Sequence, residues 1–508
     1  MRILIFHGYL LGGTGSNVYN SGLAAALARG GHVVHLLCQD RSPLEHPWVD
    51  AVGDWDGGTL RVTARREPAR VTVYRPDIAG LLPVYVADRY EGVQARPFQD
   101  LTDTELERYL EGNVTAVREV AERARPDLAL ANHLVMGPLV LARALAGLGV
   151  PYAVKIHGSA LEYTVKPHRR FMPHAREGLA GAGGVLVGSR HTAETLWEAM
   201  KDPELPARTR LSPPGVDIGR FTPRASDAAL AGVQALVGRL AEAPAGETDS
   251  SFARDAGAAA ALASLAPERD RLVVFVGKLI ASKGVELLLA AWPLVLARVP
   301  RAQLVLVGFG AFREGLERLA ADLAAGDLEA AAATRGESGG DLPLLGAFLE
   351  GLSPAEAAAY RESAARLPDR VAWTGRLDHA ELVDLLPAAE AMVVPSTFPE
   401  AFGMVAAEAA ACGALPIVAR HSGLAEVAQT LAGAVPAAVR PWLSFELGAG
   451  AVAELAAALI AWLEAPAELR AATREAMVRV TRERYSWDGV ARTVLAAAAG
   501  RLDDLPEP

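Results

Sequence analysis

Cysteine is nearly absent from this chain, with only Cys38 and Cys412 among 508 residues, each in an apolar run. Two isolated thiols form neither a disulfide framework nor a cysteine metal cluster, which favours a reducing compartment. The histidines are scattered and lack the H-E-x-x-H spacing of a metal site. We therefore expect neither a required metal ion nor a resident cofactor.

A long uninterrupted hydrophobic run is also missing. The longest apolar stretch, residues 448–465, is rich in alanine and contains Glu454, which favours a packed helix over a membrane span. The first residues, MRILIF, are typical of a strand and lack the apolar region and cleavage site of a signal peptide. We expect a cytoplasmic protein, and peripheral contact with the inner membrane face stays open.

Positive charge is in the minority, because 50 Lys and Arg residues face 60 Asp and Glu residues, for a net charge of −10. Such a chain has no general attraction to phosphate backbones, so nucleic acid is not an expected partner and any anion site must be local. Apolar residues are abundant at 51%, which is typical of a globular protein. A chain of 508 residues exceeds the roughly 250 to 300 that one core supports, so two domains are expected.

Short runs of Val, Ile and Leu alternate with longer stretches of helical period, and the alternation occurs twice. It predicts an α/β fold of two Rossmann-like domains, each a doubly wound parallel sheet. The expected strands are 2–6, 32–37, 127–131, 152–156, 184–187 and 208–211 in the first half, and 272–276, 303–307, 371–373, 391–394 and 415–418 in the second.

Composition also predicts the domain limits. We expect a first domain over 1–219, a linker with a partly helical insertion over 220–270, a second domain over 271–484, and a last helix, 485–508, that crosses back to the first domain. Residues 321–368 separate a helix from its next strand by far more than the usual ~2 to 6 residues. This second insertion is expected to be an irregular surface excursion.

Ligands of open parallel sheets bind beyond the carboxyl ends of the strands, where helix N-termini point. Glycine, histidine and charged residues follow the expected strands in both halves, which predicts a small-molecule site in a cleft between the domains. The substrate-binding candidates are Gly12, Gly13, Gly15, His133, Ser189, Arg190, Gly277, Gly308, Arg376, Phe402, Gly403, Met404, Val405 and Glu408, and the catalytic candidates are His157, Lys278, Lys283 and Glu400.

The segment GKLIASKG places Lys278 after a strand and Lys283 at the start of a helix. Two ammonium groups beside a helix N-terminus suit a diphosphate, although the same pattern also occurs at an ordinary solvated turn. Farther on, FPEAFGMVAAEAAACG places Glu400 in a loop and Glu408 on the following helix. Carboxylates accept hydrogen bonds from hydroxyl groups, so one glutamate suits a sugar and the other a ribose; a solvated pair is the alternative.

The first strand is followed by GGTGSN, which lacks the G-x-G-x-x-G spacing of a dinucleotide fingerprint and instead favours a flexible loop over a substrate. His157, in KIHGS, is the candidate that a strand end would direct toward a cleft, and a buried structural histidine is the alternative. For His133 the two interpretations are evenly balanced.

Nine segments in this order resemble the retaining family 4 glycosyltransferases of the GT-B fold. They are GGTGSN, KIHGS, VGSRHTAETL, PPGVDIGRF, FVGKLIASKGVELLL, LVLVGFG, VAWTGRLDHAEL, PSTFPEAFGMVAAEAAACG and the final YSW helix, and the resemblance spans most of the chain. The family usually has arginine where Lys278 stands, so a forked grip is replaced by a point charge.

The resemblance implies a retaining transfer of a hexose-type sugar from a nucleoside-diphosphate sugar, a co-substrate, to an acceptor that the sequence does not identify. It implies that Glu408 binds the ribose, Glu400 the transferred sugar, and Lys278 with Lys283 the diphosphate. His157 would orient the sugar, and no metal or dedicated base would be needed. A sugar-nucleotide epimerase and a catalytically silent sugar-nucleotide binding protein are the alternatives.

Overall fold

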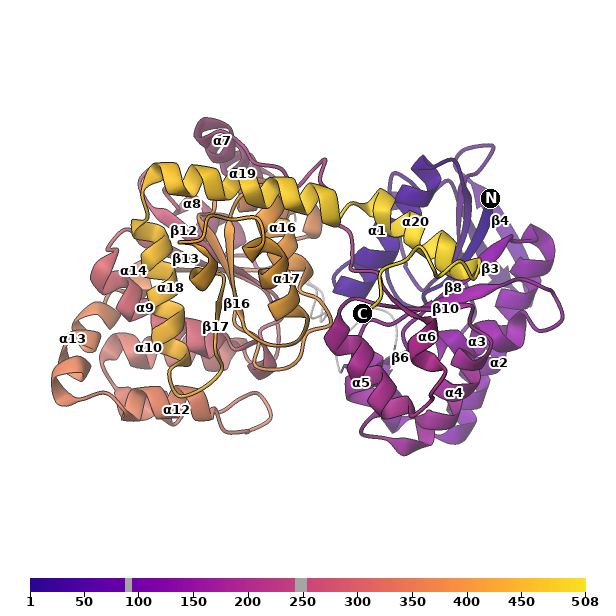
Figure 1. The fold of residues 1–508 in the computed structure, drawn as a ribbon, viewed down its shortest axis with the longest axis horizontal. Helices are drawn as coiled ribbons and strands as arrows, with labels where there is room; N and C mark the ends of the chain where they lie inside the picture. The colour runs from indigo at the N-terminus through magenta and orange to yellow at the C-terminus, as the bar shows by residue number, and fades with distance from the viewer. Residues whose placement is uncertain (87–93, 243–253) are drawn as a thin grey trace. The chain divides into compact units, whose positions relative to one another are not determined.

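The computed structural model describes residues 1–86, 94–242 and 254–508. These residues form two compact units, the first made of Met1–Gly215 with Tyr485–Pro508 and the second of Val216–Arg484 (Figure 1). Each unit contains its own parallel sheet covered by helices. Among the described residues, no helix has both the length and the apolarity needed to cross a membrane.

The sheet of the first unit has nine strands in the order β11-β10-β9-β8-β1-β2-β5-β3-β4, and only the β3–β4 pair is antiparallel. All six expected strands are present within a residue or two, whereas β3, β4, β5 and the separate β6–β7 pair were not predicted. The bounds are β1 (Arg2–Phe6), β2 (Val33–Leu37), β3 (Ala51–Asp56), β4 (Thr59–Ala64), β5 (Val71–Arg75), β6 (Leu81–Val84), β7 (Gln94–Pro97), β8 (Leu128–Asn132), β9 (Tyr152–Lys155), β10 (Gly184–Val187) and β11 (Thr209–Leu211).

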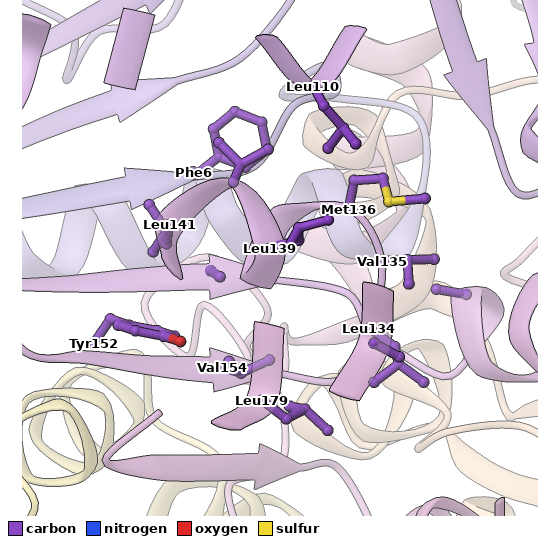
Figure 2. Packing of buried hydrophobic residues seen from close by; sticks show 14 of the residues in the cluster. Phe6, Leu110, Leu134, Val135, Met136, Leu139, Leu141, Tyr152, Val154 and Leu179 are labelled. Carbon is purple, nitrogen blue, oxygen red and sulfur yellow. The ribbon is translucent and has the colours of Figure 1, made fainter. Parts of the chain in front are cut away.

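Helices cover the two faces of this sheet, and side chains from both layers form its core. Figure 2 shows part of that core, where Phe6, Leu139, Tyr152 and Leu179 pack together as buried residues. The helices are α1 (Gly15–Arg29), α2 (Asp103–Ala124), α3 (Gly137–Ala144), α4 (Met172–Ala180), α5 (Arg190–Met200), α6 (Leu205–Arg208) and, from the end of the chain, α20 (Trp487–Ala498).

Helix α20 packs against α1 and against β8, β9 and β10, so the last segment of the chain is part of the first unit. Its Trp487 fits between Gly22 and Gly215, where an added Cβ would lie 2.4 Å from an indole atom at either glycine. Only a residue without a side chain fits at those two positions. The YSW segment therefore belongs to the core of this unit.

The sheet of the second unit has six parallel strands in the order β14-β13-β12-β15-β16-β17. Five of them were expected, and the two-residue β17 was not. The bounds are β12 (Arg271–Val276), β13 (Ala302–Val307), β14 (Val371–Gly375), β15 (Ala391–Val394), β16 (Leu415–Ala419) and β17 (Ser444–Phe445), and the helices of the surrounding layers include α9 (Val285–Arg298), α15 (His379–Leu385), α16 (Met404–Cys412), α17 (Ser422–Ala432), α18 (Ala451–Glu464) and α19 (Ala467–Arg484).

The prediction of an irregular excursion over 321–368 was wrong, because most of this stretch is helical. Tyr360 is buried and donates a hydrogen bond to the carbonyl oxygen of Ala290 at 2.8 Å, which ties the insertion to α9. A capping box of Ser353 and Glu356, a start signal in the sequence, opens one of its helices. The helices are α10 (Arg313–Ala325), α11 (Leu328–Ala332), α12 (Pro343–Glu350), α13 (Pro354–Ala364) and α14 (Leu367–Arg370).

The segment expected as a linker, 220–270, lies within the second unit. It contains α7 (Ser226–Glu242), which packs on α15, and α8 (Ala258–Ala263), which packs on β14. Residues 243–253, inside the predicted insertion, lie outside the described residues. The helical part of that prediction is confirmed for the residues that are described.

Candidate functional site

In the second unit, Glu400 lies in the loop between β15 and α16 and has two side-chain partners. Its Oε1 accepts hydrogen bonds from Lys283 Nζ and from Ser396 Oγ, the latter at 2.8 Å. Burial alone would raise the pKa of this carboxyl, but the charge of Lys283 and the two hydrogen bonds outweigh burial and lower the pKa. Glu400 is therefore an anion held beside a cation.

Lys283 reaches Glu400 because two loops approach each other closely. Lys283 ends the short 3₁₀ helix η5 (Ala281–Lys283), and Gly284 follows with a φ of +66°. A Cβ at Gly284 would lie 2.1 Å from the carbonyl oxygen of Pro395, so only glycine allows this approach. The backbone N–H of Thr397 also donates to the carbonyl oxygen of Ser282 at 3.0 Å, which joins the two loops.

Glu408 has a different basic partner, which the sequence analysis missed. Its side chain is buried on α16, and His379 Nε2 lies 2.8 Å from its Oε1. Burial lowers the pKa of His379, but the charge of Glu408 and this hydrogen bond raise it by more, so the net shift is upward. The ring of His379 also lies 4.9 Å from that of Phe221. The sequence signal was the D-H-A-E capping box, which places His379 at the first position of α15.

The chain enters α16 through Gly403, whose φ is +104° and which has no side chain that could cap the helix. Gly423 makes room for this entry, because a Cβ there would lie 2.6 Å from Cα of Phe402. The N–H groups of Met404 and Val405 belong to the first turn and have no carbonyl partner within the helix. This end of α16 thus offers backbone donors beside Glu400.

The remaining candidates of the second unit lie at the ends of β12, β13 and β14. Gly277 and Gly308 approach so closely that a Cβ at Gly308 would be 2.0 Å from the carbonyl oxygen of Gly277. Lys278 Nζ lies 6.0 Å from the centre of the Phe309 ring. Arg376 forms an ion pair with Asp378, which directly precedes His379.

In the first unit, His157 is part of a chain of uncharged hydrogen-bonding groups. Its Nε2 donates to Oδ1 of Asn132 at 2.8 Å, and Asn132 exchanges hydrogen bonds with Asn20. Asn20 Nδ2 donates to Nδ1 of His7 at 3.0 Å, and His7 Nε2 donates to Oδ1 of Asn17 at 2.9 Å. The sequence analysis did not select these four partners as site residues, although His7 directly follows a strand and Asn17 and Asn20 lie one turn apart on α1.

His133 lies beside this chain with a φ of +68° and a buried ring. Neither ring nitrogen has a hydrogen-bond partner among the described residues, and the ring lies 4.6 Å from Tyr85 and 4.9 Å from His157. Burial lowers the pKa of His133 and His157 well below the usual range and that of His7 to about 4. All three imidazoles are neutral at pH 7.

The other candidates of the first unit have local structural contacts. The carbonyl oxygen of Gly12 accepts from Asn17 Nδ2 at 2.6 Å, Gly13 has a φ of +89°, and Gly15 begins α1. Ser189 is fully buried and its Oγ caps α5, which begins at Arg190. Substrate contacts of these residues stay predictions.

Two families match the chain, one in each half. Residues 14–215 match the family described as glycosyl transferase 4-like domain, and residues 262–327 with 351–478 match the glycosyl transferases group 1. Between the matched segments, residues 216–261 and 328–350 belong to neither match.

The chain is similar to several curated proteins. It is 36% identical to a glycogen synthase of Mycobacterium tuberculosis over 138 residues, which are 27% of the chain and 30% of that protein. It is 27% identical to the D-inositol 3-phosphate glycosyltransferase of Segniliparus rotundus over 361 residues, 70% of the chain and 62% of that protein. The chain thus spans less than two thirds of the length of either relative.

Solved structures share the fold along nearly the whole chain. A sucrose-phosphate synthase from Thermosynechococcus elongatus has a TM-score of 0.57 at 19% identity and covers 97% of this chain and 96% of its own. Anabaena HepE in complex with UDP-glucose has a TM-score of 0.56 at 17% identity, and the match covers 98% of this chain and 99% of HepE. The starch synthase IV catalytic domain from Arabidopsis thaliana, bound to ADP and acarbose, has a TM-score of 0.59 at 14% identity, with 98% of both chains covered. The expected fold class, GT-B with two Rossmann-like domains, is confirmed.

Proposed function

Because both halves of the chain match glycosyltransferase families, we propose that it transfers a hexose-type sugar from a nucleoside-diphosphate sugar to a hydroxyl group of an acceptor. The observation that carries the proposal is the Glu400 cluster, in which an anion, a lysine and the start of α16 lie together. A diphosphate needs cations and backbone N–H donors, and a sugar needs a carboxylate for its hydroxyl groups.

In the proposed reaction, the bond between the anomeric carbon and the diphosphate oxygen breaks, and the acceptor oxygen bonds to that carbon on the same face. The departing phosphate takes the proton of the acceptor hydroxyl, so no dedicated base and no metal ion is required. Lys278 and Lys283 stabilise the negative charge on the leaving diphosphate, and catalysis comes from positioning and charge. The product retains the anomeric configuration.

The two glutamates have separate proposed roles. Glu400 binds hydroxyl groups of the transferred sugar, and Lys283, which neutralises Glu400 in the free protein, turns its charge to the diphosphate. Glu408 binds the ribose, with His379 holding one of its oxygens. In the first unit, the neutral His157 orients the sugar through hydrogen bonds without repelling the positive character that develops at the anomeric carbon.

The base of the donor is left open by the relatives. HepE was solved with UDP-glucose, the starch synthase IV domain with ADP, and a Mycolicibacterium smegmatis mannosyltransferase that is 29% identical over 241 residues is named as GDP-mannose dependent. That relative acts on a phosphatidylinositol monomannoside by its name, so a lipid-linked acceptor at the membrane surface is among the proposals to test.

A panel of UDP-, GDP- and ADP-sugars tests the proposal by thermal unfolding and by product analysis. A donor at 100 times its Kd stabilises the protein by about 2.7 kcal/mol, and an added acceptor should then yield free nucleoside diphosphate and a retained glycoside seen by NMR. Stabilisation without turnover would indicate a silent binding protein, and an isomerised sugar nucleotide would indicate an epimerase. If no member of the panel binds, the proposal is wrong.

A further inference from the structure

Residues 328–350 lie outside the matched family segments and belong to the second unit. Between α11 and α12 they form a tight hairpin over residues 335–341. Arg335 and Asp341 pair across its base, with a 3.1 Å ion pair between Arg335 Nε and Asp341 Oδ1. The N–H of Gly336 donates to the carbonyl oxygen of Gly340 at 2.9 Å. Glu337 projects from a turn whose backbone bonds define its shape.

The hairpin contacts the loop that carries Lys283. Oε2 of Glu337 accepts a hydrogen bond from the backbone N–H of Ala281 at 2.8 Å, and Ala281 is the first residue of η5. The backbones are also close, because a Cβ at Gly336 would lie 3.0 Å from Cβ of Ala281. Lys283 is the last residue of the same 3₁₀ helix, two positions later.

This loop therefore has an anchor on each side. Thr397 holds the carbonyl oxygen of Ser282 from the Glu400 loop, and Glu337 holds the N–H of Ala281 from the insertion. A 3₁₀ helix of three residues does not hold its shape unaided, because its hydrogen bonds are poor and nucleation is costly. A hydrogen bond to a carboxylate is stronger than one to a neutral acceptor, so Glu337 is an effective anchor.

We infer that Glu337 is a positioning residue for the donor site: by holding Ala281 it fixes η5 and so directs Lys283 toward the donor diphosphate. The inference rests on the proposed function, because it assigns the diphosphate to Lys283. The hairpin thus adds to the site an element from a segment outside the matched family residues. The negative charge of Glu337 is exposed and screened by water, so its effect on a phosphate is smaller than that of the hydrogen bond.

Two substitutions separate the hydrogen bond from the charge. Glu337→Ala removes both, whereas Glu337→Gln keeps an oxygen that can accept from Ala281. Glu350→Ala is the control, because Glu350 is an exposed acid on α12 of the same insertion. We expect Glu337→Ala to raise the Kd of the nucleoside diphosphate and the KM of the donor about tenfold, the equivalent of one hydrogen bond. Glu337→Gln should keep both constants within about threefold of the wild-type values, and Glu350→Ala should have the wild-type values.

Hydrogen exchange of the peptide over 278–286 in the ligand-free protein tests the anchor without a donor. Faster exchange in Glu337→Ala, and not in Glu350→Ala, supports the anchoring. Tighter nucleotide binding in both Glu337 variants would overturn the inference, because the hairpin would then obstruct the site. Unchanged affinity with only a lower Tm would overturn it as well. Faster exchange in a protein whose wild type binds no nucleotide would overturn the proposed function and leave the anchoring intact.

Discussion

The strand ends of the two units carry opposite chemistry on similar parallel sheets. In the second unit, each candidate glutamate has a basic partner, Lys283 for Glu400 and His379 for Glu408. In the first unit, His157 is linked to asparagine side chains, and its pKa and those of its neighbouring histidines are lowered. One edge pairs carboxylates with basic side chains, and the other contains a chain of neutral hydrogen-bonding groups.

The difference follows from the cost of burying charge. A buried carboxylate needs a cation or several donors, whereas a neutral imidazole needs only a hydrogen bond, and even His133 remains buried by losing its proton. A charged edge attracts a diphosphate, and a neutral edge suits hydroxyl groups. On the proposed function, the phosphates of the donor therefore bind to the second unit, and the first three predictions below each test one side of this comparison.

The largest effect should follow Lys283→Met, which removes the cation from the Glu400 cluster. We expect kcat/KM to fall about 10³-fold, because a preorganised charge at the leaving group is lost. Steady-state kinetics measures this, and Lys201→Met, a change of an exposed lysine in the first unit, should leave the rate unchanged. Activity within tenfold of the wild type in Lys283→Met would show that the charge of this cluster is not used in transfer.

On the neutral side, His157→Ala should lower kcat about 10²-fold and leave nucleoside diphosphate affinity within about twofold. The reason is that His157 positions the sugar and contributes no charge to the phosphates. Kinetics and calorimetric titration on the same variant separate the two quantities, with His174→Ala, which changes a half-buried histidine on α4, as the control. An equal loss of turnover and nucleotide affinity would place His157 in the nucleotide pocket and contradict the division between the units.

Glu408→Ala should raise the Kd of the nucleoside diphosphate about 30-fold. The ribose hydroxyl groups lose a carboxylate acceptor, and the partner His379 is left without its anion. Calorimetric titration of the free nucleoside diphosphate measures this. Glu408→Gln keeps an acceptor oxygen and should lose less nucleotide affinity than Glu408→Ala. Unchanged affinity in both variants would remove Glu408 from the ribose site.

The smallest effect concerns Glu286, a buried carboxyl of α9 whose Oε2 has no partner among the described residues. Burial raises its pKa to about 8, and the charge of Glu337 adds to the shift. Because the folded pKa lies above the unfolded value, its stabilisation is complete below the unfolded pKa and is lost as the pH rises through about 8. Between pH 6 and 7 the free energy of unfolding should fall by about 1 kcal/mol relative to Glu286→Gln. Parallel curves for the two proteins in denaturant titrations would contradict a buried neutral carboxyl.

The sequence predicted the parts of the fold that depend on local pattern. The strand ends could be predicted because buried parallel strands are continuous apolar runs. The helix starts after Gly284 and Gly403 could be predicted because glycine is typical of loops where backbones approach closely. The candidate pair of Lys283 and Glu400 was named from its segments, but their contact depends on two loops 117 residues apart. The partner His379 was missed because its pairing with Glu408 depends on the tertiary fold, which brings together residues 29 positions apart, and not on a spacing motif.

The insertions contain features that could not be predicted from the sequence. Residues 321–368 are rich in alanine, and their helices were not recognised from the sequence, although a capping box opens one of them, α13. Glu337 has no motif at all, and only the hairpin brings it to Ala281. In the first unit, Asn20 and Asn132 are 112 residues apart, and neither segment reveals that they pair. Long-range contacts of single polar side chains are therefore what the sequence does not reveal.

A crystal structure of the full chain with a nucleoside diphosphate tests the central claim most directly. The account predicts diphosphate oxygens about 3 Å from Lys283 Nζ and from the N–H groups that begin α16, with the ribose on Glu408. His157 and Asn132 would then contact no phosphate oxygen. A diphosphate bound at the His7, Asn132 and His157 network, with Lys283 still paired to Glu400, would contradict the assignment of the donor phosphates to the charged edge.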